Sequence, residues 1–260
     1  MKVYITTDME GISGISNWRQ VGMEGRCPEY EEGRILLTDE VNAAVEGAIA
    51  GGAKDIVVVD GHNYGHNFIA ERIHPEVRYV SSPGSVIVAQ ALDESFDAVI
   101  LLGYHAMAGT PGAILDHTQS STAWFNYYLN GRKVGEIAQG AAIAGHYNVP
   151  VVFVSGDKAA CKEAVDLLGN VETVAVKEGL SRTSALMLPP AKARALIADG
   201  IERALKRLDT FKPFKMKTPI EVKIEFQRTN DADRYQRMGW KRLDGRTVSK
   251  IAKNALEIID

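Results

Sequence analysis

DIVVVD at residues 55–60 and DAVILLG at residues 97–103 are short, almost continuously aliphatic runs. Similar runs occupy residues 2–7 (KVYITT) and 150–155 (PVVFVS). The stretches between or after these runs place apolar residues at helical spacing, over 34–50, 83–92, 135–147 and the segment after Asp157. Aliphatic strands that alternate with helices are typical of a parallel sheet covered on both faces. The sequence therefore predicts an α/β fold with a mostly parallel sheet and helices on both faces.

The second half of the chain departs from this pattern. WFNYYL and RKVGEI flank Asn130-Gly131, the preferred pair for a type I′ turn, so we expect an antiparallel hairpin excursion of the sheet around 113–134. After residue 180, Pro189-Pro190 opens an amphipathic helix, and residues 220–227 alternate as a half-buried strand. We expect an α/β metal-binding catalytic domain over 1–180. A C-terminal α+β extension, helix plus strand, would cover 181–260, either separate or packed into the same domain.

Composition narrows the class of protein. Of 260 residues, 45 % are hydrophobic, and 30 basic against 33 acidic residues give a net charge of −3. Such a chain can build a core, and it has no basic excess that would indicate a nucleic-acid or anionic-membrane partner. No apolar run reaches the roughly 18 residues of a membrane span. Two cysteines and an early pair of carboxylates, in place of an apolar leader, favour a cytoplasmic location.

Several common catalytic motifs are absent from the sequence. It holds no GxxxxGK[ST] phosphate loop, no GxGxxG, no GxSxG, no HExxH and no CxxC. The chemistry is therefore expected in carboxylates and histidines.

Such side chains follow three of the predicted strands. Asp8 and Glu10 come directly after the strand 2–7, two residues apart, and can point to one side. Asp60-Gly61-His62 and Gly103-Tyr104-His105 end the next two strands. Because ligands of open α/β sheets bind at the carboxyl ends of the strands, these groups should converge there. Glu136, which opens the helix after the hairpin, adds a further carboxylate.

Two imidazoles and three carboxylates form a ligand set that suits Zn²⁺, although Mn²⁺ and Co²⁺ bind similar sets. Five ligands exceed the needs of one tetrahedral ion, but with one bridging carboxylate they could serve two ions. Two-metal sites polarise a carbonyl and activate water. Each residue also has a simpler interpretation: the carboxylates as strand-end or helix-dipole groups, His62 as a surface residue and His105 as a buried, hydrogen-bonded histidine.

His117 follows the Gly-rich turn at 109–112 and is not needed to complete a metal site. A histidine at this place suits general acid or base catalysis near neutral pH. The alternative is a structural histidine that bonds to Asp116 or to the backbone.

The motifs also resemble those of a known family. Thr6-Thr7-Asp8-Met9-Glu10-Gly11, Asp60-Gly61-His62, Gly-Tyr-His-Ala at 103–106, His117-Thr118 and Gly135-Glu136 are similar, in the same order, to the signatures of zinc-dependent D-aminopeptidases of the DppA type, from dipeptide-transport operons. Glu225-Phe226 and the segment 230–233 extend this resemblance toward the C-terminus.

The resemblance implies a dinuclear zinc centre in which Asp8 bridges the ions. It assigns Glu10 and His62 to one ion, His105 and Glu136 to the other, and a catalytic role to His117. It further implies release of N-terminal D-amino acids, typically D-alanine, from short peptides by a ring-like homodecamer.

Two other functions fit parts of the sequence. Asp8-Met9-Glu10-Gly11 superficially resembles the DxDGT motif of Mg²⁺-dependent phosphatases, in which the first aspartate is the nucleophile, but the second carboxylate here is Glu and no paired-Asp motif follows. Imidazole is also a poor ligand for Mg²⁺. A non-enzymatic module that binds peptides or metal is the remaining alternative.

Overall fold

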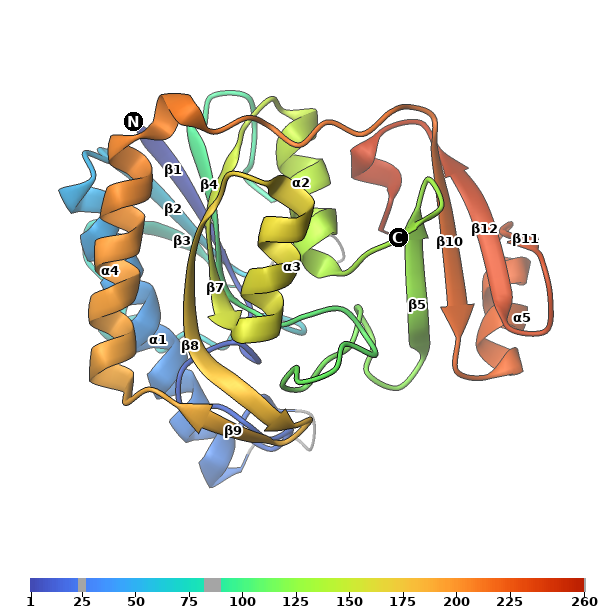
Figure 1. Cartoon of the computed structure of the whole chain (residues 1–260), viewed down its shortest axis with the longest axis horizontal. Helices are drawn as coiled ribbons and strands as arrows, with labels where there is room; N and C mark the ends of the chain where they lie inside the picture. The colour runs from blue at the N-terminus through green and yellow to red at the C-terminus, as the bar shows by residue number, and fades with distance from the viewer. Residues whose placement is uncertain (23–26, 82–89, 260) are drawn as a thin grey trace.

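The structure is a computed structural model that describes residues 1–22, 27–81 and 90–259. Its larger sheet has seven strands in the order β3-β2-β1-β4-β7-β8-β9, all parallel except β9 (Figure 1). The strands span β1 Lys2–Thr7, β2 Asp55–Asp60, β3 Arg78–Val80, β4 Ala98–Tyr104, β7 Val151–Asp157, β8 Glu172–Ser181 and β9 Ser184–Met187. The strand order reverses between β1 and β4, which is where doubly wound sheets bind ligands.

Helices cover both faces of this sheet. They are α1 Pro28–Ala50 and α4 Pro190–Lys206 on one face, and α2 Glu136–His146 and α3 Lys158–Leu168 on the other (Figure 1). A Cβ on Gly47 of α1 would lie 2.4 Å from the carbonyl oxygen of Ala198 in α4, so glycine permits this close packing. Apolar residues form one core on each face of the sheet.

A second, antiparallel sheet lies beside the first, in the order β11-β12-β10-β5-β6. Its strands are β5 Trp124–Leu129, β6 Arg132–Lys133, β10 Ile220–Phe226, β11 Lys241–Arg242 and β12 Thr247–Ala252, and α5 Thr229–Arg237 packs on it. Short 3₁₀ helices cover Ala70–Arg72, Leu208–Thr210 and Ala255–Glu257. No described helix is long and apolar enough to span a bilayer.

The predicted fold class is confirmed, with differences in detail. The first helix begins at Pro28 rather than at residue 34. The predicted hairpin forms at Asn130-Gly131, both with positive φ, but β5 pairs with β10 in the second sheet instead of extending the parallel one. The predicted helix over 83–92 lies largely outside the described residues.

The division at residue 180 stays a prediction. Elements after residue 180 join both halves of the molecule, because α4 packs on α1 while β10 pairs with β5.

Candidate metal centre

The carboxyl ends of β1, β2 and β4 bring the polar motifs together. Asp8 follows β1, His62 follows β2 and His105 follows β4. The loop after Asp8 is held on β4, because the backbone N–H of Gly11 donates to the Gly103 carbonyl at 2.8 Å. A Cβ on Gly11 would lie 2.1 Å from the Tyr104 carbonyl oxygen, so only glycine fits this contact. The sheet edge predicted from the strand-end rule is therefore the place where these side chains meet.

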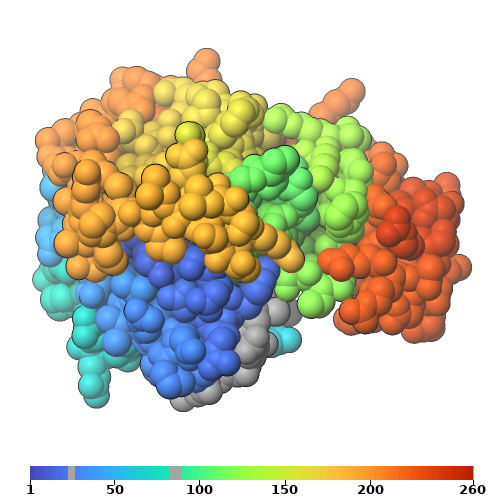
Figure 2. Space-filling model, turned by 60° about the horizontal axis from the view of Figure 1, so that its bottom comes forward, coloured from blue at the N-terminus to red at the C-terminus, as the bar shows by residue number. Residues whose placement is uncertain are grey.

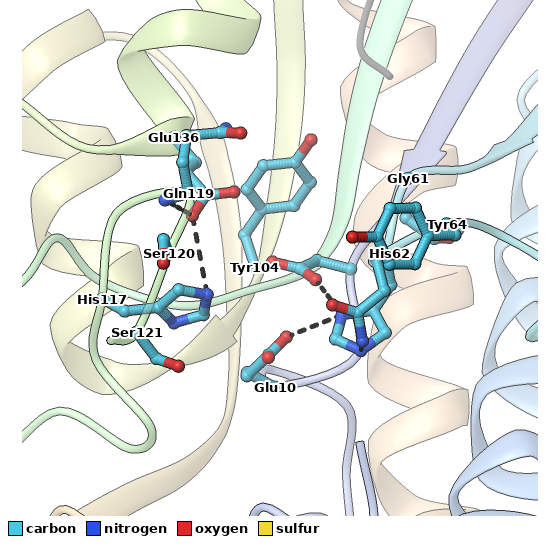
Figure 3. Close-up of a pocket in the computed structure, with 13 residues that line it drawn as sticks. Glu10, Gly61, His62, Tyr64, Tyr104, His117, Gln119, Ser120, Ser121 and Glu136 are labelled. Carbon is cyan, nitrogen blue, oxygen red and sulfur yellow. Dashed lines mark hydrogen bonds and ion pairs between the residues drawn. The ribbon is translucent and has the colours of Figure 1, made fainter. Parts of the chain in front are cut away.

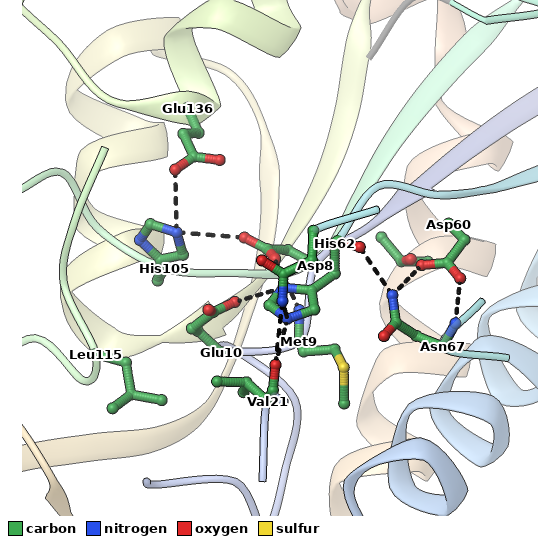
Figure 4. Close-up of polar contacts among 12 residues, drawn as sticks. Asp8, Met9, Glu10, Val21, Asp60, His62, Asn67, His105, Leu115 and Glu136 are labelled. Atoms are coloured by element: carbon green, nitrogen blue, oxygen red, sulfur yellow. Dashed lines mark hydrogen bonds and ion pairs between the residues drawn. The ribbon is translucent and has the colours of Figure 1, made fainter. Parts of the chain in front are cut away.

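Asp8 lies between the two imidazoles. Its Oδ1 is 2.9 Å from His62 Nδ1, and its Oδ2 is 3.3 Å from His105 Nε2 (Figure 4). Glu10 Oε2 lies 3.2 Å from the same His62 nitrogen. Glu136 Oε1 lies 3.4 Å from the same His105 nitrogen. The arrangement has two halves, each with one imidazole and one glutamate, and the Asp8 carboxylate joins them.

The other ring nitrogens are hydrogen-bonded to backbone carbonyls. His62 Nε2 is 2.8 Å from the Val21 oxygen, and His105 Nδ1 is 2.9 Å from the Ala106 oxygen. A carbonyl only accepts, so His105 Nδ1 carries the hydrogen, and in the neutral ring the lone pair of His105 Nε2 faces the carboxylates. His62 Nε2 also lies 2.8 Å from the side-chain nitrogen of Asn63. Because His105 Nε2 and Glu10 Oε2 are buried without a hydrogen bond, the donor set fits a cation between them.

The electrostatics also indicate a cation site. Burial would raise the pKa of Asp8, but His105 and His62 beside it hold that pKa well below its ordinary value. Burial would lower the pKa of His62, yet Glu10 and Asp8 raise it well above the ordinary value. The pKa of His105 rises in the same way beside Glu136 and Asp8. Three carboxylates therefore face two imidazoles in a buried space, and positive charge stabilises the group.

Glu136 and His117 complete the group from a separate part of the chain. Glu136 is the first residue of α2, and its Oε1 accepts the backbone N–H of Gln119 at 2.7 Å. His117 Nδ1 is 2.9 Å from the Leu115 carbonyl oxygen, and its Nε2 lies 3.8 Å from Glu136 Oε1. The His117 ring stacks on His105 at a centroid distance of 4.0 Å. His117 is thus held rigidly at the edge of the cluster.

All of these site residues except the fully buried His105 line a cavity of about 340 Å³, which we call the first cavity. Glu10 and His62 lie on one side of it, and His117, Gln119 and Glu136 lie on the other (Figure 3). Tyr64, whose side chain is exposed, also lines it. The structure therefore brings all six predicted site residues together, five of them on the wall of this cavity and His105 buried behind it. Asp60 does not join them, because its carboxylate accepts two hydrogen bonds from Asn67.

Lys177 was missed by the sequence reasoning. It lies in β8 with 3 % of its surface exposed, and its ammonium group donates to the carbonyls of Glu10, Ile12 and Ile15. Burial lowers the pKa of Lys177 to about 8, so the group stays mostly protonated at neutral pH. The available signal was a lysine inside the apolar strand TVAVKEG. Lys177 orients the loop that carries Asp8 and Glu10.

We expect Lys177→Met to lower the free energy of unfolding by roughly 3 kcal/mol, because three buried carbonyls lose a charged donor. Metal affinity should weaken as well, since Glu10 loses its support. Urea denaturation and metal titration measure both effects. Lys158→Met, at an exposed lysine paired with Glu178, is the control and should change stability by less than about 0.5 kcal/mol. A Lys177→Met protein of wild-type stability would contradict this role.

The chain is similar to characterised D-aminopeptidases in sequence and in fold. A model of the M55 peptidase family, described as D-aminopeptidase, matches residues 1–260. The D-aminopeptidase of Bacillus subtilis strain 168 is 38 % identical over 236 residues, which are 90 % of this chain and 84 % of that protein. The solved structure of the Zn-dependent D-aminopeptidase DppA from Bacillus subtilis, described as a self-compartmentalizing protease, superposes with a TM-score of 0.94 at 36 % identity, covering 99 % of this chain and 94 % of the other.

Proposed function

The chain belongs to the M55 peptidase family of D-aminopeptidases, and we propose that it releases N-terminal D-amino acids, D-alanine in particular, from short peptides at a centre of two zinc ions. The observation that carries this proposal is the position of Asp8. One carboxylate oxygen lies 2.9 Å from His62 Nδ1, and the other lies 3.3 Å from His105 Nε2. A carboxylate in this position suits a bridge between two ions.

In this proposal Asp8 would serve both ions, Glu10 and His62 would hold one, and His105 and Glu136 would hold the other. Zinc is the proposed metal because the solved relative is Zn-dependent and because imidazole with carboxylate suits it. Bound zinc would supply Lewis acidity, which would polarise a peptide carbonyl and lower the pKa of a water molecule.

His117 moves the proton. Its Nδ1 is engaged with the Leu115 carbonyl, and its Nε2 lies on the wall of the first cavity. Nε2 can therefore take a proton from the attacking water and return it to the leaving amine. The contact with Glu136 and the stacking on His105 fix the ring for this task.

The proposal extends to assembly and location. Because the solved relative is a self-compartmentalizing protease, we propose that this chain also forms a ring-like homodecamer. The cytoplasmic location expected from the sequence stays a prediction. The phosphatase alternative is not favoured, because the matching family model, the similar Bacillus subtilis protein and the similar solved structure are all D-aminopeptidases.

Elemental analysis of the purified protein, paired with peptide hydrolysis, tests the proposal. We expect about two zinc ions per chain and release of alanine from D-Ala-D-Ala, with at least about tenfold slower release from L-Ala-L-Ala, because one misplaced methyl group costs 1–3 kcal/mol in a fitted pocket. Removal of metal by a chelator should stop the reaction, and added zinc should restore it. A protein without transition metal that zinc does not activate would contradict the metal centre. Equal rates on both peptides would contradict the stereochemical preference.

A further inference from the structure

A second cavity of about 450 Å³ adjoins the first. His117 and Ser121 line both cavities, so the two are neighbours at the catalytic edge of the site. Four of the five proposed metal ligands line the first cavity. The second has instead two aromatic residues of β5, Trp124 and Phe125, and two arginines.

The two arginines come from opposite walls of the second cavity. Arg182 lies in the turn between β8 and β9 of the large sheet, and Arg246 directly precedes β12 of the small sheet. The cavity therefore lies between the two halves of the molecule. In Figure 2 the C-terminal residues (orange-red) form a lobe at one end of the molecule, and the tip of the β8–β9 arm (orange) extends toward it.

Each guanidinium group is anchored and still accessible. Arg182 donates through Nε to Asp116 Oδ1 at 2.9 Å and through Nη2 to the Asp116 carbonyl at 2.7 Å. Arg246 donates through Nη2 to Glu225 Oε1 at 2.9 Å. Both side chains are 49 % exposed. Because a guanidinium has five N–H donors, each arginine keeps donors for a further anion, and its anchor fixes its orientation.

The residues that line the second cavity include two cationic side chains and one carboxylate, while Glu225, the partner of Arg246, does not line it. Asp116 is the one acidic lining residue, and that carboxylate is already engaged by Arg182 and by the backbone N–H of Gly109. An anion with a planar, two-oxygen face matches a guanidinium best. A free peptide carries such a group at its C-terminus.

The chemistry of an aminopeptidase puts that carboxylate near this cavity. When the first residue occupies the metal centre, the remainder of the peptide must extend into an adjoining space. We infer that the second cavity binds the leaving portion of a short peptide, with Trp124 and Phe125 against its side chains and Arg246, assisted by Arg182, binding its C-terminal carboxylate. The inference rests on the proposed function and narrows the substrate class to short peptides with a free C-terminus.

Arg246 is the better residue for a test. Arg182 is tied to Asp116, which precedes His117, so its loss would also disturb the proposed proton carrier. Arg246 lies on the other sheet and contacts Glu225, which Asn126 also binds at 2.8 Å. The Arg246→Gln variant should therefore fold and leave the metal centre intact. Arg246→Lys keeps the charge without the planar fork.

The experiment compares tri-D-alanine with its C-terminal amide as substrates of the zinc-loaded enzyme. We expect the wild type to prefer the acid by about tenfold in kcat/KM, mostly through a lower KM. A tenfold preference corresponds to one charge-assisted hydrogen bond. In Arg246→Gln the acid and the amide should become equivalent, and Arg246→Lys should retain part of the preference. Arg78→Gln, at an exposed arginine paired with Asp55, is the control and should keep the full preference.

Calorimetry with both peptides on the same proteins separates this inference from the proposed function. One outcome is that no D-peptide is cleaved, yet the acid binds about tenfold more tightly than the amide and this difference depends on Arg246. That result would support the carboxylate-binding subsite and contradict the proposed activity. The other outcome is that D-peptides are cleaved, but the wild type does not prefer the acid or Arg246→Gln retains the preference for the acid. That result would overturn the subsite and support the proposed activity.

Discussion

An Asp8→Asn enzyme should bind fewer than two zinc ions per chain and lose turnover by about 10³-fold or more, because metal chemistry supplies several kcal/mol of transition-state stabilisation. Asparagine has the shape of aspartate, so packing is preserved. Its amide nitrogen cannot ligate a metal, and it would face either His62 Nδ1 or His105 Nε2. One half of the centre therefore loses a ligand, and the carboxylate that joins the halves is gone. Elemental analysis and steady-state kinetics measure the two losses, and Asp8→Ala should behave in the same way.

Asp60→Asn is the matched control for this experiment. Asp60 lies on the neighbouring strand, where it pairs in register with Thr7, the residue before Asp8, and like Asp8 it is buried. Its carboxylate contacts Asn67 and not the imidazoles. We expect Asp60→Asn to keep its zinc and to lose stability rather than chemistry. An Asp8→Asn enzyme with two zinc ions and normal turnover would overturn the bridging role.

The large sheet could be predicted because each of its central strands is recognisable from its own residues. Strands buried on both faces read as aliphatic runs, and β1, β2 and β4 were placed almost to the residue on that basis. The start of α1 was misplaced because residues 28–34, PEYEEGR, carry little apolar signal. The helix nevertheless begins there, with Pro28 in the first turn, where proline is favoured.

The small sheet could not be predicted in the same way. The turn at Asn130-Gly131 is encoded by its own residues, but the partner of β5 is β10, which lies more than 90 residues further along the chain. Such pairing depends on the tertiary fold. The helix α5 has a single buried residue, Ala232, so its sequence carries no periodic apolar signal.

The candidate site was predictable for a related reason. In a parallel sheet the carboxyl ends meet at one edge, so residues that follow different strands converge without any knowledge of loop geometry. The family resemblance read from the same motifs is confirmed. Lys177 and Arg246 could not be picked out from the sequence, because each lies beside residues distant in sequence and neither spacing nor motif connects them.

His117→Ala should separate catalysis from metal binding. We expect the variant to keep about two zinc ions and its KM while kcat falls by about 10²–10⁴-fold, the contribution of a positioned proton carrier. The reason is the orientation of the ring, since Nδ1 is engaged with the Leu115 carbonyl and Nε2 lies on the cavity wall. A small exogenous base such as imidazole should restore part of the rate. Unchanged turnover would remove His117 from the mechanism.

The zinc content of His117→Ala decides a further question. His105, His117 and Glu136 place ligand atoms within 4.8 Å of one another, so the geometry alone also permits His117 as a metal ligand. The contact between Nε2 and Glu136 Oε1 is 3.8 Å, longer than the 3.4 Å of His105 Nε2 to the same oxygen. Loss of one zinc ion in His117→Ala would therefore make His117 a ligand, whereas full zinc content with a low kcat would make it the proton carrier. His74→Ala is the control, because His74 is bonded to Glu46 away from the site and its loss should change neither quantity.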